Sequence, residues 1–147
     1  MINTIVRKHI TAIKEDLSNA KILKQLTNSD HKELVPEIFT STIIKMCIEY
    51  ESFTTEAYDF VFPKDTLKYN HPWRYTRELS SKLNINIKNE YRKAHEGWEI
   101  YNTLKHLNKR MIVSREKISL KENLKSVEEM AIFIHDALIK LLEKFIV

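Results

Sequence analysis

The C-terminal stretch SVEEMAIFIHDALIKLLEKF, residues 126–145, decides the fold. It opens with the pattern of a capping box, in which the Ser126 hydroxyl accepts a hydrogen bond from the Glu129 backbone amide and the Glu129 carboxylate reaches back. Apolar residues then recur at the three- and four-residue spacing of one helical face, namely Val127, Met130, Ala131, Ile134, Ala137 or Leu138, Leu141, Leu142 and Phe145. The stretch therefore predicts a strongly amphipathic helix.

A second apolar face on this helix consists of residues that lie off the main stripe, among them Ile132, Phe133 and Ile139. Such a helix is expected to pack on two sides. One explanation is an interface between two copies of the chain, and the other is burial inside a core of five helices. We predict a homodimer and keep burial within one chain as the alternative.

Four more helices are expected upstream, over about residues 3–26, 36–60, 73–83 and 88–113, from the same apolar periodicity. Pro36 fits the first turn of the second helix, because proline is tolerated there but not in a helix interior. One glycine and three prolines leave few sites for hairpin turns, which argues against a multi-stranded sheet. The sequence predicts an all-α fold, a single-domain helical bundle of about five helices over residues 1–147.

Gly97 lies inside the expected fourth helix, where glycine costs about 1 kcal/mol relative to alanine. Either another backbone approaches closely at this point or the helix is kinked.

Several classes of site are disfavoured by the composition. Cys47 is the only cysteine, which rules out an intrachain disulfide and a multi-cysteine zinc site, and its place on an apolar helix face predicts a buried thiol. There is no pattern of a phosphate-binding glycine loop and no closely spaced histidine pair. We expect no metal and no cofactor. No apolar run approaches the roughly 20 residues of a membrane span, and no signal peptide is recognisable, so we expect a cytoplasmic protein that does not contact a membrane.

The positive charge is concentrated in one segment. Between residues 71 and 117 there are 11 Lys and Arg residues against 5 Glu residues, a net charge of +6, whereas the rest of the chain carries −2. This excess predicts a phosphate-facing surface that includes Arg74 and Arg77, and ordinary solvated helix faces are the alternative. Trp73, beside these arginines, is a candidate for stacking on an unpaired base.

A line of polar side chains follows the expected fourth helix at spacings of three and four residues: His95, Glu99, Asn102, His106 and Arg110. Imidazole, carboxylate, amide and guanidinium groups together could bind a phosphate, move a proton and stabilise a developing negative charge. A solvated helix face would show the same line.

Two regions resemble HEPN-type helical domains. Residues 42–53, TIIKMCIEYESF, are similar to an apolar helix with an embedded glutamate and an aromatic residue that several prokaryotic HEPN families carry. Residues 107–115, LNKRMIVSR, followed by the capped helix, resemble the motif region of these domains. The resemblance implies an all-helical bundle, usually a homodimer, in which an Arg and a His from each subunit form a metal-independent RNA-cleaving site.

Arg110 corresponds to the motif Arg, and Lys109 beside it is a candidate RNA contact. Met111 stands where the family usually has Asn, and Arg115 stands where it has the catalytic His. Arginine stays protonated and cannot serve as an ordinary general base. His106, one turn before Arg110, could take over the proton transfer in a shifted geometry.

The predicted function is therefore HEPN-like binding of RNA or another nucleic acid, without catalysis, in a microbial defence or toxin–antitoxin system. The first alternative is an active metal-independent ribonuclease that uses Arg110 with His106 or His95. The second is a helical adaptor or inhibitor that binds a protein partner of a defence system.

Overall fold

The computed structural model describes residues 1–64, 71–106 and 126–147, without the side chain of His106. It contains α1 (Ile2–Leu26), the short 3-10 helix η1 (Ser29–His31), α2 (Leu34–Val61), α3 (Pro72–Lys82), α4 (Lys88–His106) and α6 (Val127–Glu143). No strand occurs in these residues. The prediction of an all-α bundle of about five helices is confirmed.

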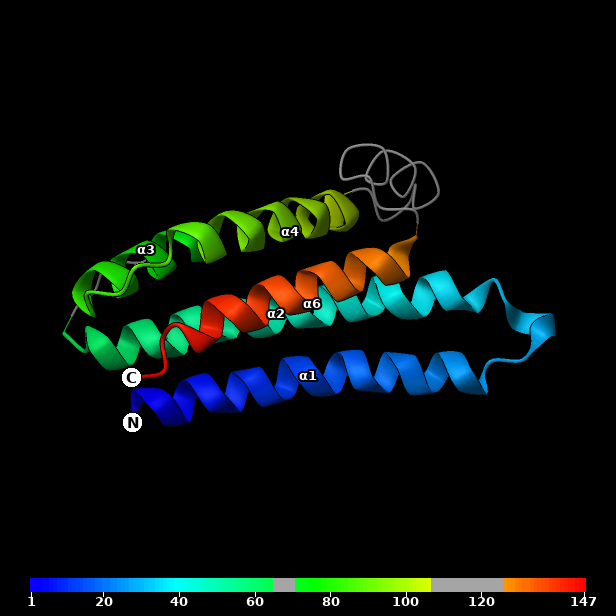
Figure 1. The fold of residues 1–147 in the computed structure, drawn as a ribbon, viewed down its shortest axis with the longest axis horizontal. Coiled ribbons are helices and arrows are strands. Elements are labelled where there is room, and N and C mark those ends of the chain that lie inside the picture. The colour runs from blue at the N-terminus through cyan, green and yellow to red at the C-terminus, as the bar shows by residue number, and fades with distance from the viewer. Residues whose placement is uncertain (65–70, 107–125) are drawn as a thin grey trace.

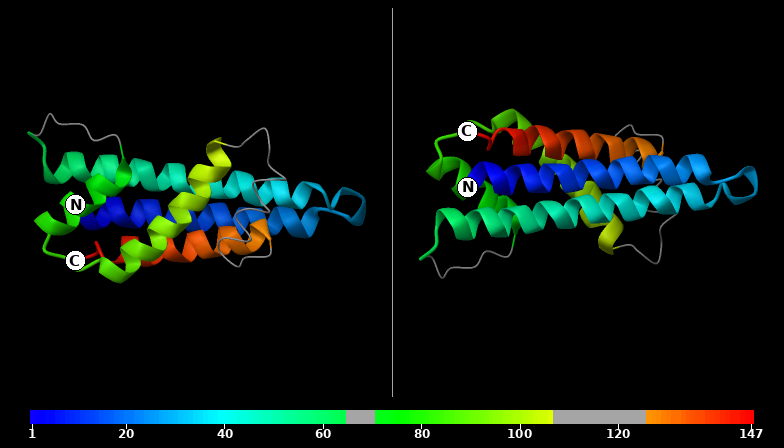
Figure 2. Two further views of the ribbon diagram at one scale, coloured as in Figure 1. Left: turned by 90° about the horizontal axis from the view of Figure 1, so that it is seen from above. Right: turned by 90° about the horizontal axis from the view of Figure 1, so that it is seen from below.

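The helices form a layered bundle (Figures 1 and 2). α1 and α2 make a long antiparallel hairpin, and α6 packs against both of them. α4 lies over α6 and α2 and crosses them obliquely, while α3 packs against α2. The turn between α1 and α2 projects beyond the first residues of α6, so that the hairpin end extends past the rest of the described bundle.

Local sequence sets several helix ends. The Ser126 hydroxyl accepts a hydrogen bond from the Glu129 backbone N–H at 3.1 Å, as predicted for the start of α6. α2 begins at Leu34, two residues before the predicted Pro36, and the proline sits in its first turn. α3 ends at Lys82, and Asn84, just beyond its C-cap Leu83, has a φ of +56° that asparagine tolerates better than most residues. The predicted fourth helix is confirmed as far as His106, and its expected continuation to residue 113 lies outside the described residues.

Aromatic rings from α2, α3 and α4 meet in the core with Phe145, which follows α6. Tyr50 and Phe53 of α2 contact Trp73, Trp98 and Phe145, with ring centroids 5.1–6.3 Å apart. The predicted burial of Cys47 is confirmed, and burial raises the pKa of its thiol, which makes it a poor nucleophile.

Close approach explains Gly97. A Cβ atom at this position would lie 3.0 Å from Cγ1 and 3.5 Å from Cα of Ile134, so α4 and α6 approach each other through the glycine.

The second apolar face of α6 is covered within the chain. α6 contacts α1, α2 and α4, Ile139 is buried, and Ile132 and Phe133 are partly buried against the core. Burial in the five-helix core is therefore the explanation that the structure supports. The second apolar face of α6 suggested a homodimer, but its burial within the chain needs no second copy.

Two polar arrangements tie distant parts of the chain together. His9 of α1 is buried between two carboxylates of α2, with Nδ1 2.6 Å from Glu49 and Nε2 2.7 Å from Glu56. At the bundle end, the Asn3 side chain donates to the Val147 carbonyl at 2.8 Å and accepts from the Val147 N–H at 2.9 Å. The two chain ends accordingly lie side by side in Figure 1.

Candidate nucleic-acid interface

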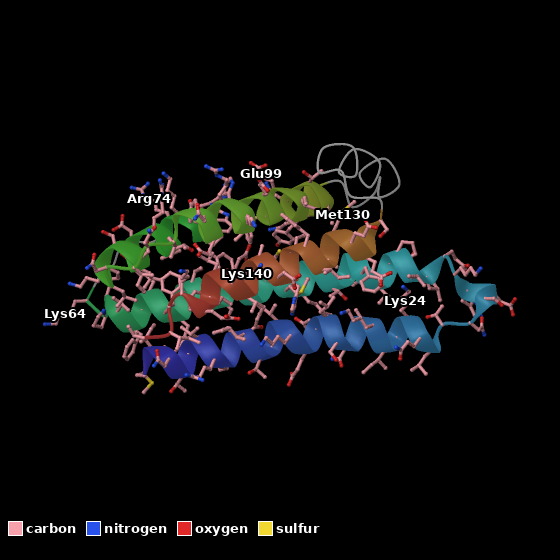
Figure 3. All side chains as sticks on the ribbon, in the orientation of Figure 1. Lys24, Lys64, Arg74, Glu99, Met130 and Lys140 are labelled. Atoms are coloured by element: carbon pink, nitrogen blue, oxygen red, sulfur yellow. The ribbon has the colours of Figure 1, made fainter. Side chains whose placement is uncertain are left out.

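The two basic side chains predicted on α3 lie on the outside of the bundle. Pro72 opens α3, and the helix then buries one face against α2 through Trp73, Thr76 and Leu79. A hydrogen bond between the Tyr50 and Thr76 hydroxyls fixes this contact, and Thr76 also donates to the Pro72 carbonyl at 2.9 Å. The opposite face leaves Arg74 and Arg77 exposed, and Figure 3 shows Arg74 directed away from the bundle.

α4 continues the same outer layer. It buries Ala94, Trp98, Tyr101 and Leu104, and this leaves Lys88, Arg92, Asn102 and Lys105 exposed. Together α3 and α4 carry seven Lys and Arg residues against four Glu residues. We call the exposed Arg74, Arg77, Lys88 and Arg92 the basic face. Because the two helices also carry the four Glu residues, their surface is positive on balance rather than uniformly cationic.

Trp73 does not have the role that the sequence suggested. Its side chain is only 3% exposed and lies among the rings of Tyr50, Tyr91 and Trp98. A base cannot stack on a ring that the core already covers, so the prediction of a stacking role for Trp73 is wrong in this fold. Its indole Nε1 is buried without a hydrogen-bond partner, which fits a side chain held by packing.

The rings that do reach the surface here are those of Tyr91 and His95. They lie one helical turn apart on α4, nearly parallel at an angle of 11°, with centroids 6.1 Å apart. Trp73 stands roughly perpendicular beneath both, at 5.2 Å from each. The His95 side chain is 40% exposed and Tyr91 is half-buried. Sequence reasoning missed Tyr91 because it falls on the apolar line of α4, although its position beside Arg92 was a signal.

Charged groups surround this ring pair. The Glu99 carboxylate lies 3.7 Å from Nδ1 of His95, where it attracts positive charge on the imidazole. Burial raises the pKa of the Tyr91 hydroxyl, and the positive charge of Arg77 offsets part of this effect. Tyr91 therefore stays a neutral hydrogen-bonding group at neutral pH.

His71, at the start of α3, is a second histidine beside the same cluster. Its ring contacts Trp98 edge-on at 5.9 Å. Burial, and then the charge of His95, lower the pKa of His71. A neutral imidazole can both donate and accept a hydrogen bond, so His71 adds a polar contact without adding charge.

Of the predicted polar line on α4, His95, Glu99 and Asn102 share the outer face at least in part. His106 ends the described part of the helix, and its side chain lies outside the description. Lys109, Arg110 and Arg115, the candidates taken from the HEPN-like motif, also lie outside the described residues. The part of the site that the structure describes is therefore the α3–α4 surface.

No match to this chain was found among protein-family models, curated proteins or solved structures. Within residues 1–64, 71–106 and 126–147, no three His, Cys, Asp or Glu side chains are placed to hold a metal ion. In the same ranges, none of the helices has the length and apolar character needed to cross a membrane.

Proposed function

We propose that the chain binds single-stranded RNA through the basic face of α3 and α4. The observation that carries this proposal is the exposure of Arg74 and Arg77 on α3, the helix that contacts the ring pair of Tyr91 and His95 through Trp73. Guanidinium groups bind phosphate oxygens in a bidentate manner, and surface rings offer a flat contact to an unpaired base.

Single strands fit this surface better than a duplex. Bases in a helical duplex are already stacked and paired, whereas unpaired bases can turn out onto aromatic side chains. The Tyr91 hydroxyl and the neutral His71 add hydrogen-bonding groups within the same cluster. The basic side chains would then follow the backbone along α3 and α4, while the rings would contact one base.

The proposal is for binding without cleavage, in a HEPN-like protein of a microbial defence or toxin–antitoxin system. Arg115 in place of the motif His removes the group that such a site would use for proton transfer, and Met111 in place of Asn removes a polar side chain beside it in the sequence motif. An arginine at that position still favours a bound phosphate. Binding therefore survives a substitution that ends catalysis.

Fluorescence anisotropy with a labelled single-stranded RNA tests the proposal. Replacing Arg74, Arg77 and Arg92 by Gln should weaken binding for every sequence and reduce the slope of log affinity against log salt by about 2, since each phosphate contact contributes about 0.7. The matched control replaces three exposed cations of α1, Arg7, Lys14 and Lys21, by Gln. The control changes the net charge equally and should leave most of the affinity.

Absence of binding at low salt, or an equal loss in the α1 control, would overturn the proposal. The former result would leave the protein-binding adaptor as the better reading. RNA products with 2′,3′-cyclic phosphate ends, formed in the presence of EDTA, would instead support the active ribonuclease. His106→Ala and His95→Ala would then show which histidine transfers the proton, because loss of a positioned acid or base lowers the rate by about 10²-fold or more.

A further inference from the structure

The projecting end of the α1–α2 hairpin contains a groove that the proposed RNA-binding surface does not use. The groove runs between the two helices and has a volume of about 460 Å³. It extends from Asp16 of α1 to Thr27, the residue after that helix, and on α2 from Leu34 to Lys45. Eleven residues of helix correspond to about 17 Å, or three turns. We call this feature the hairpin groove.

Its lining combines apolar side chains with polar ones such as Asn19 and Thr42. Ala20, Leu23, Leu34 and Ile38 line the groove, and Leu23 and Leu34 are 51% and 42% exposed. Beyond the groove, the exposed Ile48 lies on the same face of α2 as Leu34 and Ser41, at seven-residue spacing. On the other side of the same helix pair, α6 covers α1 and α2. The hairpin thus presents a helix-sized seam that no other described helix fills.

The charges at the groove suggest what fills it. Asp16 on α1 and Lys45 on α2 stand on opposite walls, near enough for the charge of Lys45 to act on the Asp16 carboxyl. A twofold axis parallel to the helices would place α1 of each copy antiparallel to α2 of the other. Asp16 of one copy would then meet Lys45 of the second copy, twice, while the exposed leucines meet at the axis. The Asp16 and Lys45 pair is complementary to itself under this symmetry, although the α2 wall also carries Glu37 farther toward the turn.

We propose that the hairpin groove is a self-association site that binds the hairpin end of a second copy of this chain. Two α1–α2 hairpins would pack as four helices and cover Leu23, Leu34 and Ile48 of both copies. The interface is small, so the dimer should dissociate in the micromolar range. It involves neither α6 nor the basic face.

Sedimentation of the full chain over micromolar concentrations should show a reversible monomer–dimer equilibrium. Leu23→Asp and Leu34→Asp should each weaken the dimer by about tenfold or more, as expected for a central apolar contact. Ile22→Asp is the matched control, because Ile22 is 50% exposed but does not line the groove. Far-UV circular dichroism and melting should show all three variants folded, since the replaced side chains are exposed.

Charge exchange separates a second copy from any other occupant. Asp16→Lys alone and Lys45→Glu alone should each be monomeric, because like charges then face each other across the axis. An equimolar mixture of the two variants should recover a dimer that contains one of each. A wild-type protein that stays monomeric at high micromolar concentration would overturn the proposal. A dimer that is unaffected by Leu23→Asp, or a mixture that fails to recover association, would overturn it equally.

Discussion

The buried histidine between α1 and α2 is held by an unusual pair of contacts. His9 is 2% exposed, and both of its ring nitrogens face a carboxylate oxygen, from Glu49 and from Glu56. Ionised carboxylates only accept hydrogen bonds, so both contacts are satisfied together when the ring carries two protons. The His9 ring thereby joins α1 to two acidic side chains that both belong to α2.

We expect His9→Ala to lower the free energy of unfolding by about 3 kcal/mol, because it removes the buried ring that bonds both carboxylates and leaves Glu56 with Lys8 as its partner. Lys8→Ala is the control: the neighbouring Lys8 also binds Glu56, at 2.7 Å, but its side chain is 58% exposed. Exposed pairs contribute about 1 kcal/mol or less. Urea unfolding of both variants measures the difference, and equal losses would show that burial of His9 adds nothing.

Glu56 makes the stability depend on acid. Its hydrogen bond to Lys8, and then the one to His9, lower the pKa of Glu56 from the ordinary value of 4.5. The folded chain thus binds a proton at this carboxylate less readily than the unfolded chain does. The stabilisation is complete above the ordinary pKa and is lost as the pH falls through the lowered pKa.

Thermal melting between neutral and acidic pH should show this loss below a pH of about 4.5 in the wild type. Glu56→Gln should be less stable than the wild type at neutral pH, and the gap should narrow as the pH falls. Glu78→Gln, a change at an exposed carboxylate of α3, serves as the control. Its melting temperature should stay close to that of the wild type at every pH. A constant gap between Glu56→Gln and the wild type would contradict the assignment.

The contact of α4 with α6 depends on a missing side chain. Gly97→Ala would gain about 1 kcal/mol of helix propensity. Its Cβ, however, would meet Cγ1 of Ile134 at 3.0 Å, and Ile134 is fully buried and cannot move aside freely. Overpacking of this kind costs about 1–3 kcal/mol, so we expect a net loss of stability.

A double-mutant cycle measures the contact. Ile134→Ala removes the Cγ1 atom, and Gly97→Ala made in that background should be neutral or stabilising. Denaturant unfolding of the four proteins gives the coupling energy. Additive effects would mean that α4 and α6 shift apart without cost.

The ends of the helices were predictable where local chemistry sets them. The residues that each helix contacts in the folded chain were not. The Ser126 cap, the proline in the first turn of α2 and the apolar stripe of α6 are all readable from neighbouring residues. The burial of Trp73 was also readable, because Trp73, Thr76 and Leu79 follow helical spacing. The arginines beside it drew attention to the wrong face.

Contacts between distant residues had no sequence signal. His9 meets Glu49 and Glu56, which are 40 and 47 residues away, and nothing in the spacing distinguishes this pair of glutamates from others. Similarly, the second face of α6 predicts a neighbour but does not say whether that neighbour is α4 of the same chain or a helix of another copy. Only the packing of the whole bundle decides this.

At the scale of the whole molecule, the two proposed surfaces lie on different layers. The basic face belongs to α3 and α4, and the hairpin groove belongs to the projecting end of α1 and α2 (Figure 1). A dimer formed through the hairpins would leave both basic faces open. One RNA strand long enough to reach both would then be held by two sites, and its affinity would exceed that of either site alone.

The hydrogen bonds between Asn3 and Val147 have a topological consequence. Because these two residues are already held together, the helices could keep the same packing if the chain began and ended at another place. A circular permutant could join these ends through a short linker and open instead at residues 84–86, between α3 and α4. Such a chain would begin with α4 and finish with α3, and its helices could still assemble around the same core.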